Sequence, residues 1–288
     1  MIVKRPAATV PVTPLVVGAG GARPRSDHLA AEEPLEIRVN HRGEDHQVSV
    51  TMRTPGNDFE LASGFLYAEG IVSAREEIDQ VRYCVGGPEE QQFNIVTVAL
   101  RPGVSFDPAR LERNFYTTSS CGVCGKASLE ALAIRGADPL PDGPVVDAAT
   151  LGALPGLLRE HQTVFDRTGG LHAAGLFRPD GTLVAVREDV GRHNAVDKLV
   201  GWLLMEGSLP ASDRILVVSG RASFEIMQKA LAAGIPIVAA VSAPSSLAVA
   251  VAEEYAMTLA GFVRGDSLNV YAGASRVRVA TSGDEGEA

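Results

Sequence analysis

Cysteine is scarce in this chain, whose 288 residues include three of them, Cys84, Cys121 and Cys124. Three unevenly placed thiols cannot form the dense disulfide framework of a small secreted domain. Such a count fits a reducing cytosol, where thiols are more often catalytic or metal-binding. We therefore expect a cytoplasmic protein whose cysteines carry chemistry rather than crosslinks.

Excess positive charge and long apolar runs are also lacking. The formal net charge is -9, which argues against a nucleic-acid binder driven by electrostatics. Prolines interrupt the N-terminal stretch MIVKRPAATVPVTP, so no secretory signal is predicted. The most apolar window, residues 235–262, contains Pro244 and then Glu253 and Glu254. It predicts a buried strand followed by a helix, and no membrane partner is expected.

The two ends of the chain have compositions unlike the rest. Residues 1–30 are rich in Pro, Gly, Ala and Arg without periodicity, and this predicts a disordered tail. Residues 281–288, TSGDEGEA, are expected to form a short acidic tail.

Residues 31–112 are predicted to form a small β-rich domain with one helix. Alternation of apolar and polar residues is typical of half-buried strands. Strands are expected at residues 35–40, 46–53, 81–85 and 93–100, the last two forming a hairpin. Asn57 with Glu60 three residues later resembles a capping arrangement, so a helix is expected to begin here.

Residues 136–280 alternate apolar strand patterns with helical ones. This rhythm predicts a layered α/β sheet with parallel strand pairs. Strands are expected at residues 170–177, 182–189, 213–220, 235–243 and 267–273, and helices at residues 192–207, 224–234 and 245–261.

Between these halves, residues 113–135 carry a cysteine loop and a following helix, with the sequence TTSSCGVCGKASLE at 117–130. Cys121 and Cys124 precede Lys126 and a helix-forming run, so the helix dipole and the lysine should favour thiolate over thiol. A thiolate can take sulfur from a persulfide by the displacement that underlies disulfide exchange. Metal binding, redox cycling, sulfur carriage and two incidental thiols all stay open from this motif alone.

Two of these alternatives are weakened by what surrounds the motif. A structural zinc site needs two further Cys or His ligands, and the histidines show no pair at metal spacing. A thioredoxin-type pair follows the first strand of a βαβ unit, whereas this pair precedes the α/β half.

Hydroxyl and basic residues, with one glycine, follow the predicted strands of the α/β half. They are Ser219, Gly220, Arg221, Ser242, Ser245 and Ser246. Open α/β sheets bind ligands at the carboxyl ends of their strands, and helix N-termini offer N–H groups to phosphates. Arg192 and His193, at a helix start, either contact such phosphates or cap the helix. His172, inside a strand, is expected to be a satisfied core histidine rather than a ligand.

Five motifs occur in one order between about residue 34 and residue 280: SSCGVCGK, TGGLHAAGLF, REDVGRHNAVDK, SGRASFEIMQKA and GFVRGDSLNVY. Together they resemble the FdhD/NarQ family, sulfur carriers needed for formate dehydrogenase activity. The resemblance implies a sulfurtransferase that accepts sulfur from a cysteine desulfurase as a persulfide on Cys121, with Cys124 supporting it. The sulfur then passes to a molybdenum (or tungsten) bis(molybdopterin guanine dinucleotide) cofactor, bound as substrate and mimicked by GDP, for the client formate dehydrogenase.

The resemblance also implies a homodimer, a cytidine-deaminase-like α/β domain and a cofactor-binding segment. That segment comprises Phe262, Val263, Arg264, Gly265, Asp266 and Ser267. Its chemistry fits, because Arg264 can pair with phosphate, Gly265 allows close backbone approach and Asp266 can accept hydrogen bonds from guanine. The alternative is a solvated turn before an edge strand.

The deaminase likeness allows a check on catalytic zinc. Deaminases need H-x-E at one helix start and P-C-x-x-C at the next. Here the first position is His193-Asn194-Ala195 and the second is SGRASFE, so no catalytic metal is predicted. A cofactor-binding chaperone that moves no sulfur is the main alternative function, and a thiol-disulfide oxidoreductase is another.

Overall fold

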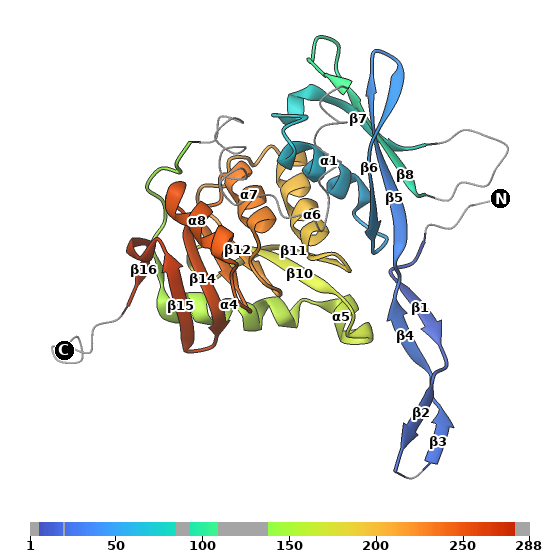
Figure 1. The fold of residues 1–288 in the computed structure, drawn as a ribbon, viewed down its shortest axis with the longest axis vertical. Helices are drawn as coiled ribbons and strands as arrows, with labels where there is room; N and C mark the ends of the chain where they lie inside the picture. Colours follow the sequence, from blue (N-terminus) through green and yellow to red (C-terminus); the bar gives the residue numbers. More distant parts are fainter. Residues whose placement is uncertain (1–5, 20, 85–92, 109–137, 280–288) are drawn as a thin grey trace.

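The computed structural model describes residues 6–19, 21–84, 93–108 and 138–279. The chain forms a β-rich unit, a larger α/β unit and a β-ribbon that extends away from both (Figure 1). Among the described helices, none combines the length and the apolar character needed to cross a membrane.

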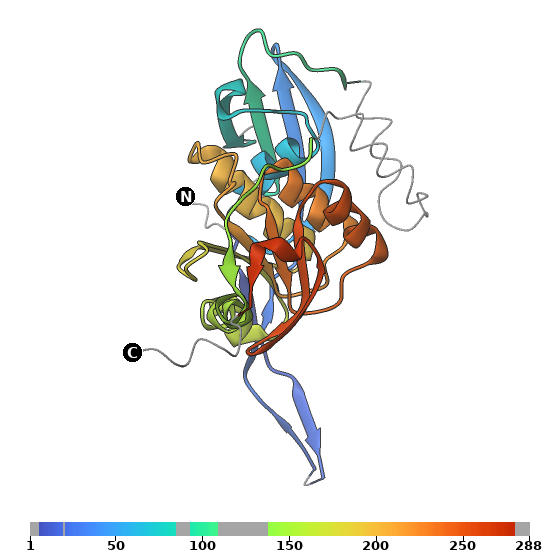
Figure 2. The ribbon, with the colours of Figure 1, turned by 90° about the vertical axis from the view of Figure 1, so that its left-hand side faces the viewer.

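The ribbon occupies most of the segment expected to be a disordered tail, and that expectation is wrong for residues 9–18 and 21–30. Strand β1 (Thr9–Val12) pairs antiparallel with β4 (Asp27–Ala30), and β2 (Leu15–Gly18) pairs antiparallel with β3 (Gly21–Pro24). Figure 2 shows, from a second direction, the same β-ribbon extending away from the rest of the chain. The prediction failed because composition says nothing about backbone hydrogen bonds formed with a partner strand farther along the chain.

The β-rich unit is a four-stranded sheet in the order β6-β5-β8-β7 with one helix. The elements are β5 (Glu33–His41), β6 (Glu44–Arg53), α1 (Asp58–Ala68), a 3₁₀ turn (Arg75–Glu77), β7 (Ile78–Tyr83) and β8 (Ile95–Leu100). Strands β5 and β8 are parallel, and the other pairs are antiparallel. Four strands lie where they were predicted, and β7 and β8 pair antiparallel as expected, although β7 begins and ends earlier than the predicted 81–85. The predicted hairpin loop falls outside the described residues.

The predicted cap of α1 is not formed. Asn57 has a left-handed backbone with φ 57° and makes no side-chain capping bond. Glu60 does not turn back to the helix start, because its carboxylate pairs with Arg187 of the α/β unit at 2.7 Å. A tertiary ion pair has replaced the local one that the spacing suggested.

The α/β unit contains a six-stranded sheet in the order β11-β10-β12-β13-β14-β15. The strands are β10 (His172–Phe177), β11 (Leu183–Asp189), β12 (Ile215–Val218), β13 (Ile237–Ala240), β14 (Thr258–Arg264) and β15 (Ser267–Ala272). Strands β12, β13 and β14 are parallel and the remaining pairs are antiparallel. The layered α/β sheet with parallel pairs is confirmed.

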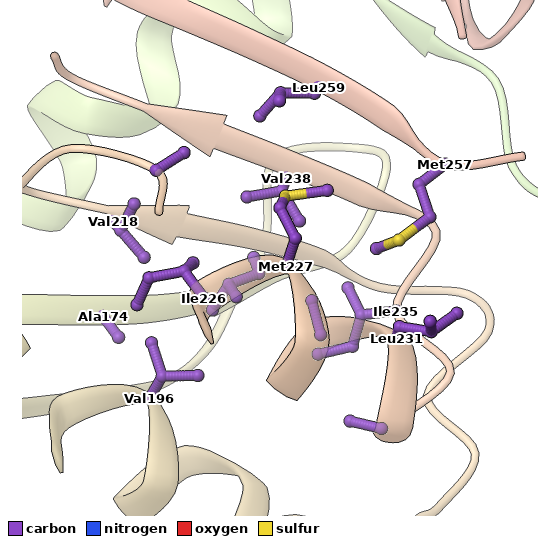
Figure 3. Packing of buried hydrophobic residues seen from close by; sticks show 14 of the residues in the cluster. Ala174, Val196, Val218, Ile226, Met227, Leu231, Ile235, Val238, Met257 and Leu259 are labelled. Carbon is purple, nitrogen blue, oxygen red and sulfur yellow. The ribbon is translucent and has the colours of Figure 1, made fainter. Parts of the chain in front are cut away.

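Helices cover both faces of this sheet. On one face lie α6 (Arg192–Met205), α7 (Phe224–Ala232) and α8 (Ser246–Glu254), whose apolar side chains meet those of the strands in one buried cluster. Figure 3 shows Val196, Ile226 and Val238 in that cluster. On the other face α4 (Ala148–Glu160) contributes Leu154 and Leu158 to a second cluster.

One predicted helix is partly wrong. The segment 245–261 was expected to be helical throughout, but α8 ends at Glu254 and β14 begins at Thr258. Strand β14 lies between β13 and β15 and is largely buried, so it carries a continuous apolar run. Such a run cannot be distinguished from a buried helix by periodicity.

Several further elements had no counterpart in the sequence prediction. They are α4, α5 (Thr163–Thr168), and β9 (Val146–Asp147), which pairs in parallel with β16 (Val277–Arg278).

Helices α1 and α6 join the two units, and much of the motif REDVGRHNAVDK serves this junction. Lys198 is 1% exposed, and its Nζ lies 2.7 Å from Asp189 Oδ2 and 3.0 Å from the Thr54 carbonyl oxygen. Asn194 Nδ2 donates to the Met52 carbonyl at 2.8 Å. These buried polar groups hold the β-rich unit against the α/β unit, so they are not free to bind a ligand.

Candidate functional site

A cavity of about 700 Å³ opens at the carboxyl edge of the parallel strands. Ser219 and Val241 follow β12 and β13, and Val263 ends the buried part of β14. His172 reaches the same edge because β10 runs antiparallel to β12. Helices α4 and α5 form the opposite wall. Ligands of open α/β sheets bind at this edge, and the volume lies within the roughly 300–1,000 Å³ of small-molecule sites.

Only part of the predicted cofactor-binding segment lines this cavity. Val263, Arg264 and Gly265 line it, whereas Phe262, Asp266 and Ser267 are not among its lining residues. Asp266 and Ser267 are exposed in or beside the turn between β14 and β15. The alternative expectation of a turn before an edge strand is therefore correct as local structure, and the same turn also borders the cavity.

Phe262 stands out within the segment. Its φ of 53° lies in the left-handed region, and its side chain is 41% exposed. The strand register shifts between Gly261 and Arg264, and the Phe262 N–H donates to the Ser242 carbonyl at 3.2 Å. This bulge turns Phe262 outward and leaves Val263 inside, so the six residues of the segment do not all face the same side.

The turn that carries Arg264 is seated on helix α4. A Cβ added at Gly152 would lie 1.8 Å from the Gly265 carbonyl oxygen, so only glycine permits this approach. Gly265 itself has φ 57°, which favours glycine. Arg264 is exposed and makes no ion pair with the part of the chain that the structure describes, so its guanidinium is available to an anionic ligand.

His172 is half-buried, and its ring makes no hydrogen bond with the described residues, so it is not the satisfied core histidine that was expected. Burial lowers the pKa of His172, and the positive charges of Arg192 and His193 lower it further, while Asp189 opposes them. His172 therefore presents a neutral imidazole to the cavity at neutral pH, which can either donate or accept a hydrogen bond.

The first two residues of α6 differ in their partners. His193 Nε2 lies 2.8 Å from Glu225 Oε2 and 3.1 Å from Ser223 Oγ, so His193 joins α6 to α7. The hydrogen bond from His193 lowers the pKa of Glu225. Arg192 Nε is buried without a hydrogen-bond partner among the described residues. Neither side chain lines the cavity.

Helix α5 is positioned by Glu188 of the motif REDVGRHNAVDK. The two carboxylate oxygens accept hydrogen bonds from the N–H groups of Val164 at 2.9 Å and Phe165 at 2.8 Å. This capping replaces the one that the residue before the helix would otherwise supply. Phe165 lines the cavity, so a residue of β11 fixes one of its walls.

Comparison with known proteins shows to which family the chain belongs. The FdhD/NarQ family profile matches residues 30–278. The chain belongs to the FdhD/NarQ family. It is 56% identical to the sulfur carrier protein FdhD of Mycolicibacterium paratuberculosis, over 92% of this chain and 97% of that one. It is 54% identical to the protein of the same name from Streptomyces coelicolor, over 93% and 95% of the two chains.

A solved structure agrees with the family assignment. A protein from Desulfotalea psychrophila, described as a candidate formate dehydrogenase accessory protein, superposes with a TM-score of 0.73 at 25% identity. The match covers 94% of this chain and all of that one. The two chains therefore share a fold across both units.

The cysteines predicted to be catalytic, Cys121 and Cys124, lie outside the described residues. Their roles stay predictions from the sequence. The described chain stops at Pro108 in the β-rich unit and resumes at Asp138 before α4. Within residues 6–19, 21–84, 93–108 and 138–279, no three His, Cys, Asp or Glu side chains gather closely enough to hold a metal ion.

The wall formed by α4 and α5 is the part of the site that sequence reasoning missed. Pro155 inside α4 interrupts the usual helix signal, and α5 has only six residues. A usable signal existed at Gly169, which ends α5 with φ 65°, because glycine marks left-handed helix termini.

Proposed function

We propose that this protein is a cytoplasmic sulfur carrier that serves formate dehydrogenase. The observation that carries the proposal is its similarity to relatives named sulfur carrier protein FdhD, which extends over nearly the whole chain. The motif with Cys121 and Cys124 adds a chemical reason, since paired thiols beside Lys126 favour the reactive thiolate.

The proposed chemistry is transpersulfidation. The Cys121 thiolate attacks the outer sulfur of a persulfide on a cysteine desulfurase, a new S–S bond forms on Cys121, and the donor thiolate leaves. No external oxidant or reductant is consumed. The carried sulfur then goes to a molybdenum bis(molybdopterin guanine dinucleotide) cofactor, which is the substrate of this protein. Cys124 assists in a role secondary to that of Cys121.

The cavity at the carboxyl edge of the sheet supports the cofactor part of the proposal. Arg264 is free to pair with a phosphate, and the Gly265 backbone permits close approach. GDP, which carries the same guanine and diphosphate, is the proposed mimic. Within the predicted segment, Val263, Arg264 and Gly265 line the cavity and are proposed to contact GDP, and the roles of Phe262, Asp266 and Ser267 stay predictions. A homodimer completes the proposal.

Intact-mass analysis after incubation with a cysteine desulfurase and ³⁴S-labelled cysteine tests sulfur carriage. The expected result is a gain of one sulfur atom that a reducing agent removes and that Cys121→Ala abolishes. Cys84→Ala is the matched control and should keep the gain.

The alternative function, a chaperone that binds the cofactor without moving sulfur, gives a different outcome. It predicts no mass gain by the wild-type protein, with GDP binding intact. A thiol-disulfide oxidoreductase would instead show a loss of two hydrogens on oxidation and no added sulfur.

A further inference from the structure

Gln162 lies at the wall of the cavity, and its side-chain amide makes no hydrogen bond with the described residues. Its side chain is 4% exposed and lines the cavity next to the start of α5. It stands at the N-cap position of α5 but makes no capping hydrogen bond. No other residue in the described part of the chain bonds to its amide either. The amide atoms are not sealed from solvent, so they open to the cavity and are available to a ligand.

Glu188 is the reason that the Gln162 side chain makes no capping hydrogen bond. Its carboxylate occupies the N–H groups of Val164 and Phe165 at the first turn of α5, which an N-cap side chain would otherwise satisfy. The Gln162 amide is thereby released from helix capping. Its backbone still anchors the helix, because the Gln162 carbonyl accepts from the Asp166 N–H at 2.9 Å. The backbone of Gln162 is thus fixed at the cavity wall, and its amide is not used by the described chain.

We propose that Gln162 binds the ring edge of a ligand that carries adjacent N–H and C=O groups, the cyclic amide shared by guanine and pterins. A glutamine amide supplies one acceptor and one donor side by side, which matches that edge. Phe165, half-buried on the same wall, carries the Arg159 guanidinium over its ring at 4.6 Å from the centroid, so the two side chains together can contact such a ring.

This assignment rests on the proposed function and makes it more specific. Arg264 at the rim suits the phosphates, whereas Gln162 at the wall suits the base or the pterin. The exposed Asp266, which the sequence suggested for guanine recognition, does not line the cavity. Base recognition by Gln162 therefore replaces a role that the sequence had given to another residue.

Gln162→Met tests the inference, because methionine keeps the length of the side chain and removes both hydrogen-bonding groups. Calorimetric titrations use three probes: GDP, 6-carboxypterin and inorganic pyrophosphate. We expect GDP or 6-carboxypterin to bind roughly ten-fold to a hundred-fold more weakly to the variant, from the loss of two hydrogen bonds. Pyrophosphate, which lacks a ring, should bind equally to both proteins. Arg264→Ala should weaken pyrophosphate and GDP alike.

The probes also distinguish the source of the ring. If Gln162→Met loses affinity for GDP alone, Gln162 binds guanine. If it loses affinity for 6-carboxypterin alone, Gln162 binds the pterin. Unchanged affinity for both rings overturns the role of Gln162 while leaving the proposed function intact. A wild-type protein that binds none of the three probes overturns the cofactor site and this inference together.

A second measurement needs no ligand. Replacing an amide that has no partner in the described chain by an apolar side chain of the same length should leave the melting temperature nearly unchanged. Gln80→Met, at an exposed position of β7, is the control and should change neither stability nor binding. A fall of several degrees confined to Gln162→Met would mean that the amide has a structural partner, and the inference would be wrong.

Discussion

Gly64 in α1 and Asp197 in α6 meet backbone to backbone. A Cβ added at Gly64 would lie 1.9 Å from the Asp197 carbonyl oxygen. The contact is reciprocated one turn away, where a Cβ added at Gly201 of α6 would lie 1.8 Å from the Glu60 carbonyl oxygen. Two glycines on facing helices therefore set the distance between the β-rich unit and the α/β unit.

Gly64→Ala should destabilise the protein strongly. The added methyl cannot be accommodated by a side-chain rotation, because its neighbours are backbone atoms, so the helices must move apart at a cost of about 1–3 kcal/mol or more. Urea unfolding followed by circular dichroism measures the loss. Gly156→Ala in α4 is the matched control, since nothing lies within 4 Å of its added Cβ, and it should be neutral or slightly stabilising. Equal effects from the two substitutions would contradict the close contact.

Asp197 should make stability fall as the pH rises. Burial raises its pKa from 3.8 to about 6, although Lys229 Nζ lies 2.6 Å away and opposes the shift. A carboxyl whose pKa is higher in the folded than in the unfolded state stabilises the fold fully below its unfolded pKa. That contribution is lost as the pH rises through the folded pKa.

The comparison with Asp197→Asn isolates this effect. Between pH 4 and pH 7 the free energy of unfolding of the wild type should fall relative to that of the variant, by on the order of 1–3 kcal/mol. Urea titrations at both pH values measure the difference. A relative rise would show that Lys229 outweighs burial.

Glu188→Ala should loosen α5 and, with it, the cavity. Without the carboxylate, the N–H groups of Val164 and Phe165 lose their partners, at a cost of roughly 0.5–2 kcal/mol for a helix cap. Hydrogen exchange should accelerate at these amides, and GDP should bind more weakly because Gln162 and Phe165 lose their fixed positions. Glu36→Ala, in β5 of the other unit, is a control that should leave α5 unchanged. Unaltered exchange in α5 would contradict the positioning role of Glu188.

The family motifs had uneven predictive value. In REDVGRHNAVDK the sequence suggested phosphate contacts for Arg192 and His193, yet most polar residues of the motif hold other parts of the chain. Lys198 and Asp189 form a buried pair at the junction, and Glu188 caps α5. A linear motif shows which residue types occur together, but their partners, such as Thr54 and Val164, lie elsewhere in the chain.

The sequence by itself determined the strand patterns, the α/β class of the second half and the chemical nature of the C-x-x-C motif, because periodicity and spacing are local properties. Only the tertiary structure decided that β1 pairs with β4 and β2 with β3 as a ribbon, that β14 is a strand, and that Arg264 shares a cavity with His172 and Gln162. Each of these depends on groups that are distant in the chain, through backbone pairing, burial between neighbouring strands, and the convergence of strand ends at one edge of a sheet.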